Sequence, residues 1–405
     1  MKTLRVIPLA MLAALGSAVC AVAQSPQPVS LHQIAQLVSS DGAANDEFGY
    51  SIAMSGNFLV AGAPQLNGAG IGKAYVFEKG ANGWADATQI AELTPSDGVM
   101  NLWFGIEVAI NGNTIVVDAG SFVGSGIQPR EYVFVEPASG WADMTETAQL
   151  KLSSGDGLGA VAVAGDTIMA AAPEENNDQG VIYVFVKPQG GWRNGLRPVA
   201  RLTDSDGALR GFLGKSLAFN GNTLVAGSDL ATAFVYVRPA GGWVTTTETA
   251  ALTASGQGVS GEFGSSISMS GATIVVGDAA NGSQYYGAAY LYYEPPTGWA
   301  NATQSAEIVS PNLQAYGYFG VSVGVSGNLL MIGANGETIN GLEDVGAVYV
   351  FDGTTQLAEL TPSDTQYLES MGWSGTARDN TIAAGAVYAT VGNNFAQGKV
   401  YVFGH

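Results

Sequence analysis

The feature that most constrains the fold is an internal repeat. The segment FGYSIAMSGNFLVAGAP, from Phe48 to Pro64, predicts two short apolar strands joined by a tight turn at Ser55-Gly56-Asn57. Further copies start at Phe104, Leu213, Phe263 and Phe319, and two degenerate copies start at Leu158 and Met371. Successive starts lie 56, 54, 55, 50, 56 and 52 residues apart. Such a period predicts an array of seven like units rather than unrelated domains.

Each unit contains four predicted strands. The opening pair is followed by an aromatic strand such as Lys73–Lys79 and by a weaker strand such as Thr88–Thr94. The first strand is rich in Gly, Ser and Ala, and the third is rich in Tyr and Phe. Small residues suit the crowded centre of a ring of sheets, and large ones suit its wider rim. We therefore expect an all-β, seven-bladed β-propeller of four-stranded blades, with residues 24–405 as one domain.

The two ends of this ring are predicted to join. The seventh unit stops after its aromatic strand at Lys399–Phe403, so it lacks an outer strand. The segment HQIAQLV at His32–Val38 matches the outer-strand pattern TQIAELT but belongs to no other blade. We expect it to pair with Lys399–Phe403, which would remove two open sheet edges.

Residues 1–23 have the pattern of an export signal. Lys2 and Arg5 precede an apolar run from Val6 to Val22, and Ala21-Val22-Ala23 suits cleavage before Gln24. An alternative is a lipoprotein anchored through Cys20. We expect a secreted chain, extracellular or periplasmic, without a membrane span.

Composition narrows the function classes. Without the signal, 13 Lys and Arg face 34 Asp and Glu, so the net charge is 13 minus 34, or −21. This charge disfavours nucleic acids and anionic membranes as partners. Cleavage removes the single cysteine, and the two histidines, His32 and His405, each lie next to an end of the folded chain. No catalytic residues are predicted, because neither a Cys/His nucleophile nor a cluster of histidine ligands can form.

A column of acidic residues is the best candidate for a metal site. Aspartates stand seven residues before the Phe-Gly position in four units, at Asp41, Asp97, Asp206 and Asp364. Aspartate before glycine more often caps its own turn, so we favour that role. If a metal binds, the expected ligands are Asp41, Asn45 and Asp46, which lie beside Glu47 in SDGAANDEFG.

A tryptophan also recurs, between the third and fourth strands of five units. It follows a glycine each time, at Trp84, Trp141, Trp192, Trp243 and Trp299. Exposed aromatic rows can stack on sugars, but recurrence at one structural position favours a packing role.

The Phe-Gly pair, Gly62-Ala63-Pro64 and the following AYVF strand resemble the FG-GAP repeat of integrin α-chain propellers. The resemblance is closest to secreted bacterial proteins built only from such repeats, and it covers about residues 36–405. It implies a propeller with a binding or adhesion role. The family's calcium loop, with a pattern like DxDxDG, is replaced here by short turns such as Ser55-Gly56-Asn57. These turns offer too few oxygens for calcium, so no cofactor is predicted from that loop.

We expect a monomeric, non-enzymatic binding or adhesion module that recognises an extracellular protein or glycan. The predicted contact surface is the set of loops between strands two and three, which differ in every unit: Gln65–Gly72, Ser121–Arg130, Glu174–Gly180, Asn281–Gly287 and Asn335–Gly346. The alternatives are a polysaccharide-active enzyme with carboxylates in the central channel and a structural envelope or matrix protein.

Overall fold

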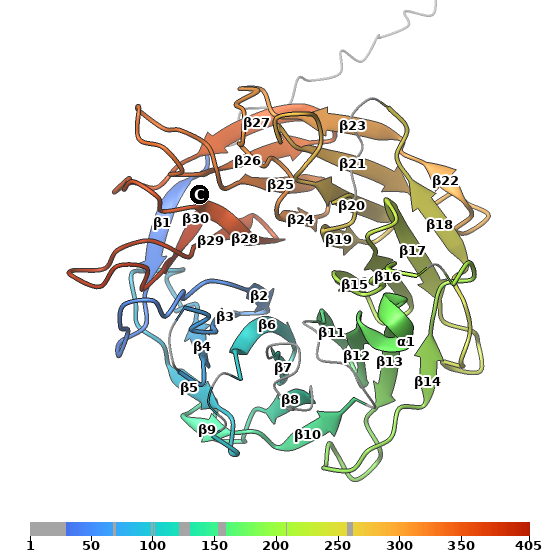
Figure 1. Cartoon of the computed structure of the whole chain (residues 1–405). Coiled ribbons are helices and arrows are strands. Elements are labelled where there is room, and N and C mark those ends of the chain that lie inside the picture. The colour runs from blue at the N-terminus through green and yellow to red at the C-terminus, as the bar shows by residue number, and fades with distance from the viewer. Residues whose placement is uncertain are drawn as a thin grey trace, which may run out of the picture.

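The structure, a computed structural model, describes residues 30–67, 70–98, 100, 102–120, 130–152, 159–207, 209–256 and 262–405. These residues form seven sheets around a central channel (Figure 1). Each sheet has four antiparallel strands, and two sheets gain a short fifth strand. The predicted all-β, seven-bladed propeller is confirmed. Residues 1–23, the predicted export signal, lie outside the described residues.

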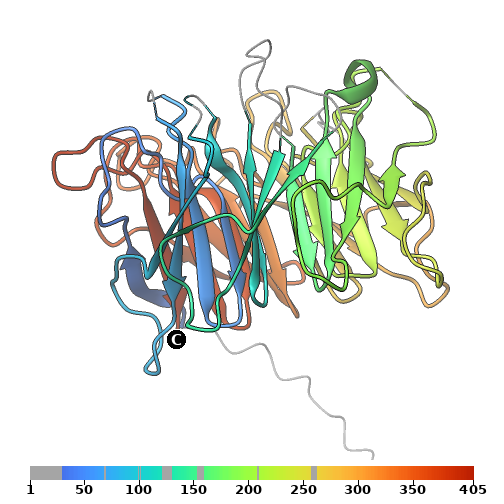
Figure 2. The same ribbon diagram turned by 90° about the horizontal axis from the view of Figure 1, so that it is seen from below.

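The blades follow one another along the chain. Blade 1 has β2 (Ile52–Ser55), β3 (Phe58–Ala63), β4 (Lys73–Glu78) and β5 (Ala91–Thr94); blade 2 has β6 (Phe104–Asn111), β7 (Thr114–Ala119), β8 (Arg130–Val135) and β10 (Ala148–Lys151); blade 3 has β11 (Val161–Ala164), β12 (Thr167–Ala172), β13 (Val181–Val186) and β14 (Ala200–Leu202); blade 4 has β15 (Leu217–Phe219), β16 (Thr223–Gly227), β17 (Thr232–Val237) and β18 (Ala250–Thr253). Blade 5 has β19 (Ser266–Ser270), β20 (Thr273–Asp278), β21 (Ala288–Tyr293) and β23 (Ala306–Val309); blade 6 has β24 (Val323–Ser326), β25 (Leu329–Ala334), β26 (Ala347–Asp352) and β27 (Thr355–Leu360); blade 7 has β28 (Met371–Arg378), β29 (Thr381–Ala386), β30 (Lys399–Gly404) and β1 (His32–Leu37). A one-turn helix, α1 (Glu175–Asp178), lies in a loop of blade 3 (Figure 2).

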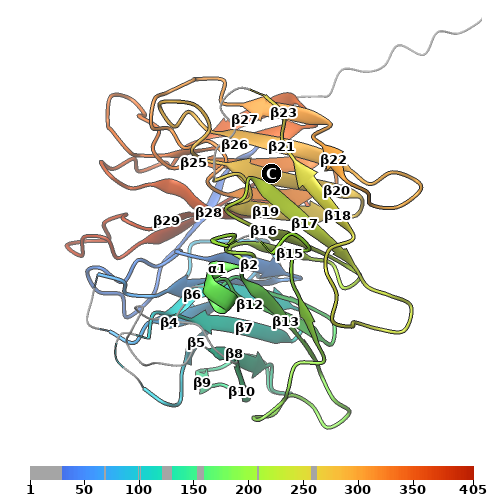
Figure 3. The same cartoon turned by 45° about the vertical axis from the view of Figure 1, so that its right-hand side comes forward.

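The ring closes as the sequence predicts. Strand β1 pairs antiparallel with β30, with Leu37 opposite Val400 and His32 opposite Gly404. The side chains of Ala35 and Leu37 are buried in the core between blades 7 and 1. The N-terminal strand therefore completes blade 7 beside β30 (Figure 1), and blades 7 and 1 lie next to each other in the ring (Figure 3).

Two glycines of the repeat bring neighbouring blades together at the channel. The Phe-Gly glycine has a positive φ, for example 94° at Gly105, which favours glycine. Its carbonyl oxygen lies against a glycine of the preceding blade, so a Cβ atom on Gly62 would lie 1.8 Å from the oxygen of Gly105. The same contact joins Gly227 with Gly264, Gly277 with Gly320, Gly333 with Gly372, and Gly385 with Gly49.

The rims of the blades are also joined. Short strands β9 (Met144–Thr145) and β22 (Ala302–Thr303) pair in parallel with the outer strands of the preceding blades, β5 and β18. The polar residue two positions after each recurrent tryptophan accepts a hydrogen bond from a backbone N–H group on the outer strand of the preceding blade. Asp143, for example, accepts from Glu92 at 2.9 Å. The equivalent acceptors are Asp86, Asn194, Thr245 and Asn301. This link between blades was not predicted.

The recurrent tryptophans pack rather than present an open face. All five are buried, with 5 to 9% of their surface exposed, and each belongs to a hydrophobic core between blades. The ring of Phe58, for example, meets Trp141 of the next blade edge-on at 6.5 Å. This burial supports the packing role and leaves no row of tryptophans for sugar stacking.

Candidate functional site

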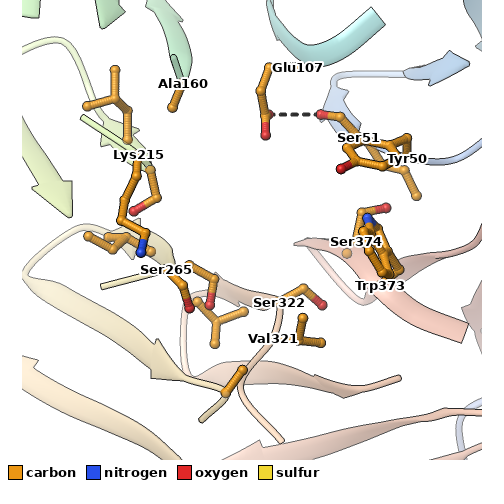
Figure 4. A pocket seen from close by; sticks show the side chains of 18 of the residues that line it. Tyr50, Ser51, Glu107, Ala160, Lys215, Ser265, Val321, Ser322, Trp373 and Ser374 are labelled. Carbon is orange, nitrogen blue, oxygen red and sulfur yellow. Dashed lines mark hydrogen bonds between the residues drawn. The ribbon is translucent and has the colours of Figure 1, made fainter. Parts of the chain in front are cut away.

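The candidate site is a cavity of about 590 Å³ at the end of the channel where the inner strands begin. We call it the channel mouth and define it by Tyr50, Ser51, Glu107, Lys215, Ser322 and Trp373, which line it (Figure 4). Second strands end and third strands start at this same end of each blade. The channel mouth therefore opens on the face that carries the variable loops, which we call the loop face.

The channel mouth is lined by two consecutive positions of the repeat, and they behave differently. The position two residues after the start of each Phe-Gly unit holds a different residue in every blade: Tyr50, Ile106, Ala160, Lys215, Ser265, Val321 and Trp373. All of these except Ile106, which is buried, line the cavity. The next position is serine in five blades. Four of these hydroxyls donate to the Phe-Gly glycine carbonyl of the next blade: Ser216, Ser266, Ser322 and Ser374. The serine position thus joins blades, whereas the variable position is available for a ligand.

One wall of the channel mouth is aromatic. The rings of Tyr50 and Trp373, from blades 1 and 7, lie 5.4 Å apart at 52°. Tyr388, from the loop after β29, meets Trp373 edge-on at 5.9 Å. All three side chains are partly exposed. Ring closure by β1 brings these two blades side by side, so the wall depends on the closed ring.

The rest of the channel mouth is polar. Glu107 is half-buried and accepts a hydrogen bond from the Ser51 hydroxyl at 3.1 Å. Burial raises the pKa of Glu107 to about 7, and the Ser51 bond offsets only part of that effect. Lys215, on blade 4, lies elsewhere on the wall of the cavity and pairs with Asp229, with Glu262 at 3.6 Å. The channel mouth therefore combines aromatic faces, hydroxyls, a carboxyl group and an ammonium group.

A second cavity, of about 530 Å³, continues the channel beyond the mouth. Both cavities are bounded by a ring of mostly apolar residues: Ile52, Val108, Val161, Leu217, Ile267, Val323 and Gly375. This apolar ring therefore separates the polar groups of the channel mouth from those of the second cavity, which include Arg378 and Asp379.

The loop face also carries an exposed cluster of aromatic rings, the tyrosine patch of Tyr285, Tyr316 and Tyr318. The ring of Tyr285 stacks on Tyr316 and lies 5.8 Å from each of the other two rings. Tyr285 and Tyr316 are 43 and 55% exposed. Backbone bonds hold the two loops together, because Tyr316 donates to Gln284 at 2.7 Å and Tyr318 donates to Tyr285 at 3.1 Å. The patch lies on the predicted contact loop Asn281–Gly287 and its neighbour.

The other predicted contact loops are described to different extents. In Glu174–Gly180, the carboxylate of Glu175 is buried and bonded to Tyr183 and Arg201, so part of this loop is structural. Glu337 of Asn335–Gly346 is likewise buried and bonded to Tyr349. Residues 68–69 of Gln65–Gly72 and 121–129 of Ser121–Arg130 lie outside the described residues.

The structure places the predicted metal ligands in separate bonds to protein groups. Asp41 pairs with Lys73 and accepts from Tyr75 at 3.0 Å. Asp46 accepts from the Ala43 N–H at 2.6 Å and from the Gln65 amide at 2.8 Å. Asn45 has a positive φ of 64° and donates its N–H to Phe395. Glu47 accepts from the Leu66 N–H at 3.0 Å. Within the described ranges, no three His, Cys, Asp or Glu side chains are grouped to hold a metal ion.

Three of the four aspartates in the acidic column have a structural role different from the predicted turn cap. Asp41, Asp97 and Asp364 each bond to a cation and a tyrosine of the third strand, as Asp97 does with Arg130 at 2.6 Å and Tyr132 at 3.0 Å. Turn capping falls instead to Asp204, which accepts from the Gly207 N–H at 2.7 Å. The cations stand two residues before their tyrosines, at Lys73, Arg130 and Lys399, and this spacing could have revealed the pairing.

Sequence reasoning did not single out Tyr50, Glu107, Lys215 or Trp373. For Tyr50, Lys215 and Trp373, the signal that could have found them is variation at one phase of the repeat, directly after each Phe-Gly pair. For Glu107, which lies one position later, the signal is its departure from the serine of five other blades. Scaffold residues recur at their phase, whereas these residues do not.

Comparison with known families agrees with the repeat. Four segments match the FG-GAP repeat: residues 31–77, 87–134, 246–292 and 302–351. Each segment runs from an outer strand through the first three strands of the next blade. No curated protein matches the chain. Among the described residues, none of the helices has the length and apolar character required to cross a bilayer.

Proposed function

Because this chain is an FG-GAP repeat protein that forms a β-propeller, we propose that it is a non-enzymatic binding module for an extracellular glycan. The observation that carries the proposal is the channel mouth, with its aromatic wall beside a carboxyl group and serine hydroxyls. Ligand sites typically combine apolar walls with a few convergent polar groups. The C–H faces of a sugar suit the rings of Tyr50 and Trp373, and its hydroxyls suit Glu107 and Ser51.

The size of the cavity supports this ligand class. A volume of about 590 Å³ lies within the range of small-molecule sites and accommodates one or two sugar rings. The channel mouth opens on the loop face, so a longer chain could continue over the neighbouring loops. Protein ligands are the alternative occupant of this face, and the tyrosine patch is the feature that favours them.

A glycan array followed by calorimetric titration of the best ligand tests the proposal. We expect Trp373→Ala to weaken binding at least tenfold, because it removes one aromatic face from the channel mouth. Tyr293→Ala is the matched control, since Tyr293 is 49% exposed and lies at the end of β21 beside another cavity. Equal binding by wild type and Trp373→Ala would contradict the proposed site. Adhesion that fails only with Tyr285→Ser and Tyr316→Ser would favour a protein ligand.

One observation favours a second candidate, a polysaccharide-active enzyme. Glu107 lines the channel mouth with a pKa of about 7, which suits a general acid, and Glu262 lines the same cavity. We nonetheless expect no turnover on common glycoside, ester or peptide substrates. Hydrolysis that Glu107→Gln abolishes would establish the enzyme instead.

We also propose that the chain is exported as a monomer after cleavage before Gln24. The support is the pattern of residues 1–23 and the pairing of β1 within its own ring. N-terminal sequencing of the exported protein and its mass in solution check both points. An acylated Cys20 at the mature N-terminus would instead establish the lipoprotein alternative.

A further inference from the structure

Blade 2 departs from the repeat at three positions that lie side by side. Glu107 stands where five other blades have serine, and Asp118 stands where five have glycine. Glu131 replaces an alanine, valine or isoleucine of the third strand. In the strand register, Glu107 lies opposite Asp118, and Asp118 lies opposite Glu131. We call these three residues the carboxyl row.

Asp118 and Glu131 of the carboxyl row lie on the side of blade 2 that faces blade 3. Asp118 lies two residues from Val116 on β7, and Glu131 lies two residues from Val133 on β8, so each pair points to the same face of the sheet. Both valines pack in the core between these two blades. Five other blades have glycine at the position of Asp118. A Cβ atom on that glycine would lie only 1.8 to 2.3 Å from a glycine carbonyl oxygen of the next blade. An aspartate fits at residue 118, so the junction of blades 2 and 3 cannot repeat that close contact.

Burial makes ionisation of the carboxyl row costly. Asp118 is 2% exposed and Glu131 is 0% exposed. Within the described part of the chain, neither oxygen of Glu131 has a hydrogen-bond partner, nor has Oδ2 of Asp118. Buried charges require pairing or neutralisation. The flanking sequences 121–129 and 153–158 contain no Lys, Arg or His to supply a counter-charge.

The groups that face the row favour its neutral form. Burial, and then the neighbouring carboxyl groups, raise the pKa values of Asp118 and Glu131 well above their usual range. An N–H bond from Ala119 lowers the pKa of Asp118 only in part. From blade 1, Ser51 donates to Glu107, and Tyr50 faces the same carboxyl group. Glu107 lines the channel mouth and gives the row its contact with solvent (Figure 4).

We propose that the carboxyl row is a proton-holding lock between blades 2 and 3, which stays closed while its carboxyl groups are neutral and loosens when they ionise. At the loosened junction, like charges at cross-strand neighbours repel one another. The other junctions lack the row, so the response is local to blades 2 and 3. This inference concerns the stability of the ring and does not depend on the identity of the ligand.

The sign of the pH effect follows from linkage. In the unfolded chain the three groups ionise near their ordinary pKa values, whereas in the folded chain they keep their protons to higher pH. Between those two ranges the folded chain binds more protons, so its stability falls as the pH rises. For Glu107 this window runs from its ordinary 4.5 to about 7.

Thermal unfolding of the full mature protein from pH 5 to pH 9 tests the lock. We expect the wild-type Tm to fall across this range more than the Tm of Asp118→Asn/Glu131→Gln, which cannot ionise at these positions. A second variant, Glu107→Ser/Asp118→Gly/Glu131→Ala, has the residues that stand at the equivalent positions of other blades. Its Tm is expected to change even less with pH. The matched control, Glu78→Gln/Glu343→Gln/Asp379→Asn, neutralises three exposed carboxylates and should keep the wild-type profile.

Hydrogen exchange, corrected for the intrinsic pH dependence, locates the effect. Between pH 5 and pH 8, protection should fall in β6, β7, β11 and β12 and stay constant in β19, β20, β24 and β25. Parallel pH profiles for wild type and the Asp118→Asn/Glu131→Gln variant would overturn the proposal. It would also be overturned if calcium or magnesium restored the wild-type Tm at pH 8 but not that of the variant, because the row would then hold a cation.

Discussion

The rims of the blades and the channel mouth are built by opposite rules. At the rim, the same residue types recur at the same phase: a buried tryptophan, and two residues later a polar side chain that bonds to the preceding blade. At the channel mouth, the residue after each Phe-Gly pair differs in all seven blades. Residue types that recur at equivalent positions of the blades therefore hold the ring together. Positions at which the residue type changes from blade to blade provide the candidate binding residues.

Of the changes that test this comparison, removal of the N-terminal strand should have the largest effect on stability. Deletion of the mature chain up to Val38 removes the pairing of β1 with β30 and the buried side chains of Ala35 and Leu37. We expect a loss of about 5 kcal/mol or more in the free energy of unfolding, with loss of binding, because Tyr50 and Trp373 then flank an open seam. Denaturant unfolding measures it. A truncated chain as stable as the intact one would show that the ring does not depend on this strand.

Substitution of a rim tryptophan should have the second-largest effect on stability. Trp141→Ala leaves a large cavity in the core of blades 1 and 2, and we expect it to cost about 3 to 5 kcal/mol. At a temperature where the variant remains folded, its affinity for ligand should equal that of wild type. Loss of affinity in the folded variant would break the separation between rim and mouth.

The acid-cation pairs on the third strands should contribute less. Lys73 and Lys399 bond to Asp41 and Asp364, and although burial opposes the effect, these bonds and those from the tyrosines lower both aspartate pKa values. The pairs therefore stabilise the ring above the ordinary pKa of 3.8 and lose that effect as the pH falls through the lower folded values.

Both aspartates are more than one-third exposed, so water screens them, and we expect Asp41→Asn or Asp364→Asn to cost about 1 kcal/mol each. Thermal unfolding at pH 7 and pH 3 checks the prediction. A variant that is destabilised equally at both pH values would contradict the ionic origin.

Calcium removal should have the smallest effect. Asp41, Asn45 and Asp46 take part in separate protein bonds, so we expect a chelator to lower the Tm by a few degrees at most. A drop of tens of degrees would make these residues a ligand set.

The fold could be predicted because its determinants are local and repeated. Each recurring feature has one physical role, namely glycines at fixed positions, small residues on inner strands and aromatic residues on third strands. Seven copies of these features support the same prediction of a propeller. Even the closing strand His32–Leu37 was predictable, since it matches the outer strands of other blades. The parallel strands β9 and β22 were not, because they depend on pairing between blades.

The candidate site was much less predictable. Tyr50 and Trp373 lie 323 positions apart in the sequence and meet only because the ring closes. The carboxyl row depends on strand register, which no local pattern in blade 2 reveals. The predicted metal ligands illustrate the converse, because Asp41 and Asp46 are neighbours in sequence but bond to different groups.

The most direct test of the separation between ring and mouth is to measure ligand affinity and Tm on one preparation of Tyr50→Ala/Trp373→Ala. The account predicts that affinity for the glycan found on the array falls at least tenfold while the Tm falls by a few degrees at most. Retained affinity would contradict the channel mouth as the binding site. A collapse of the Tm comparable to that of Trp141→Ala would show that these aromatics hold the ring instead.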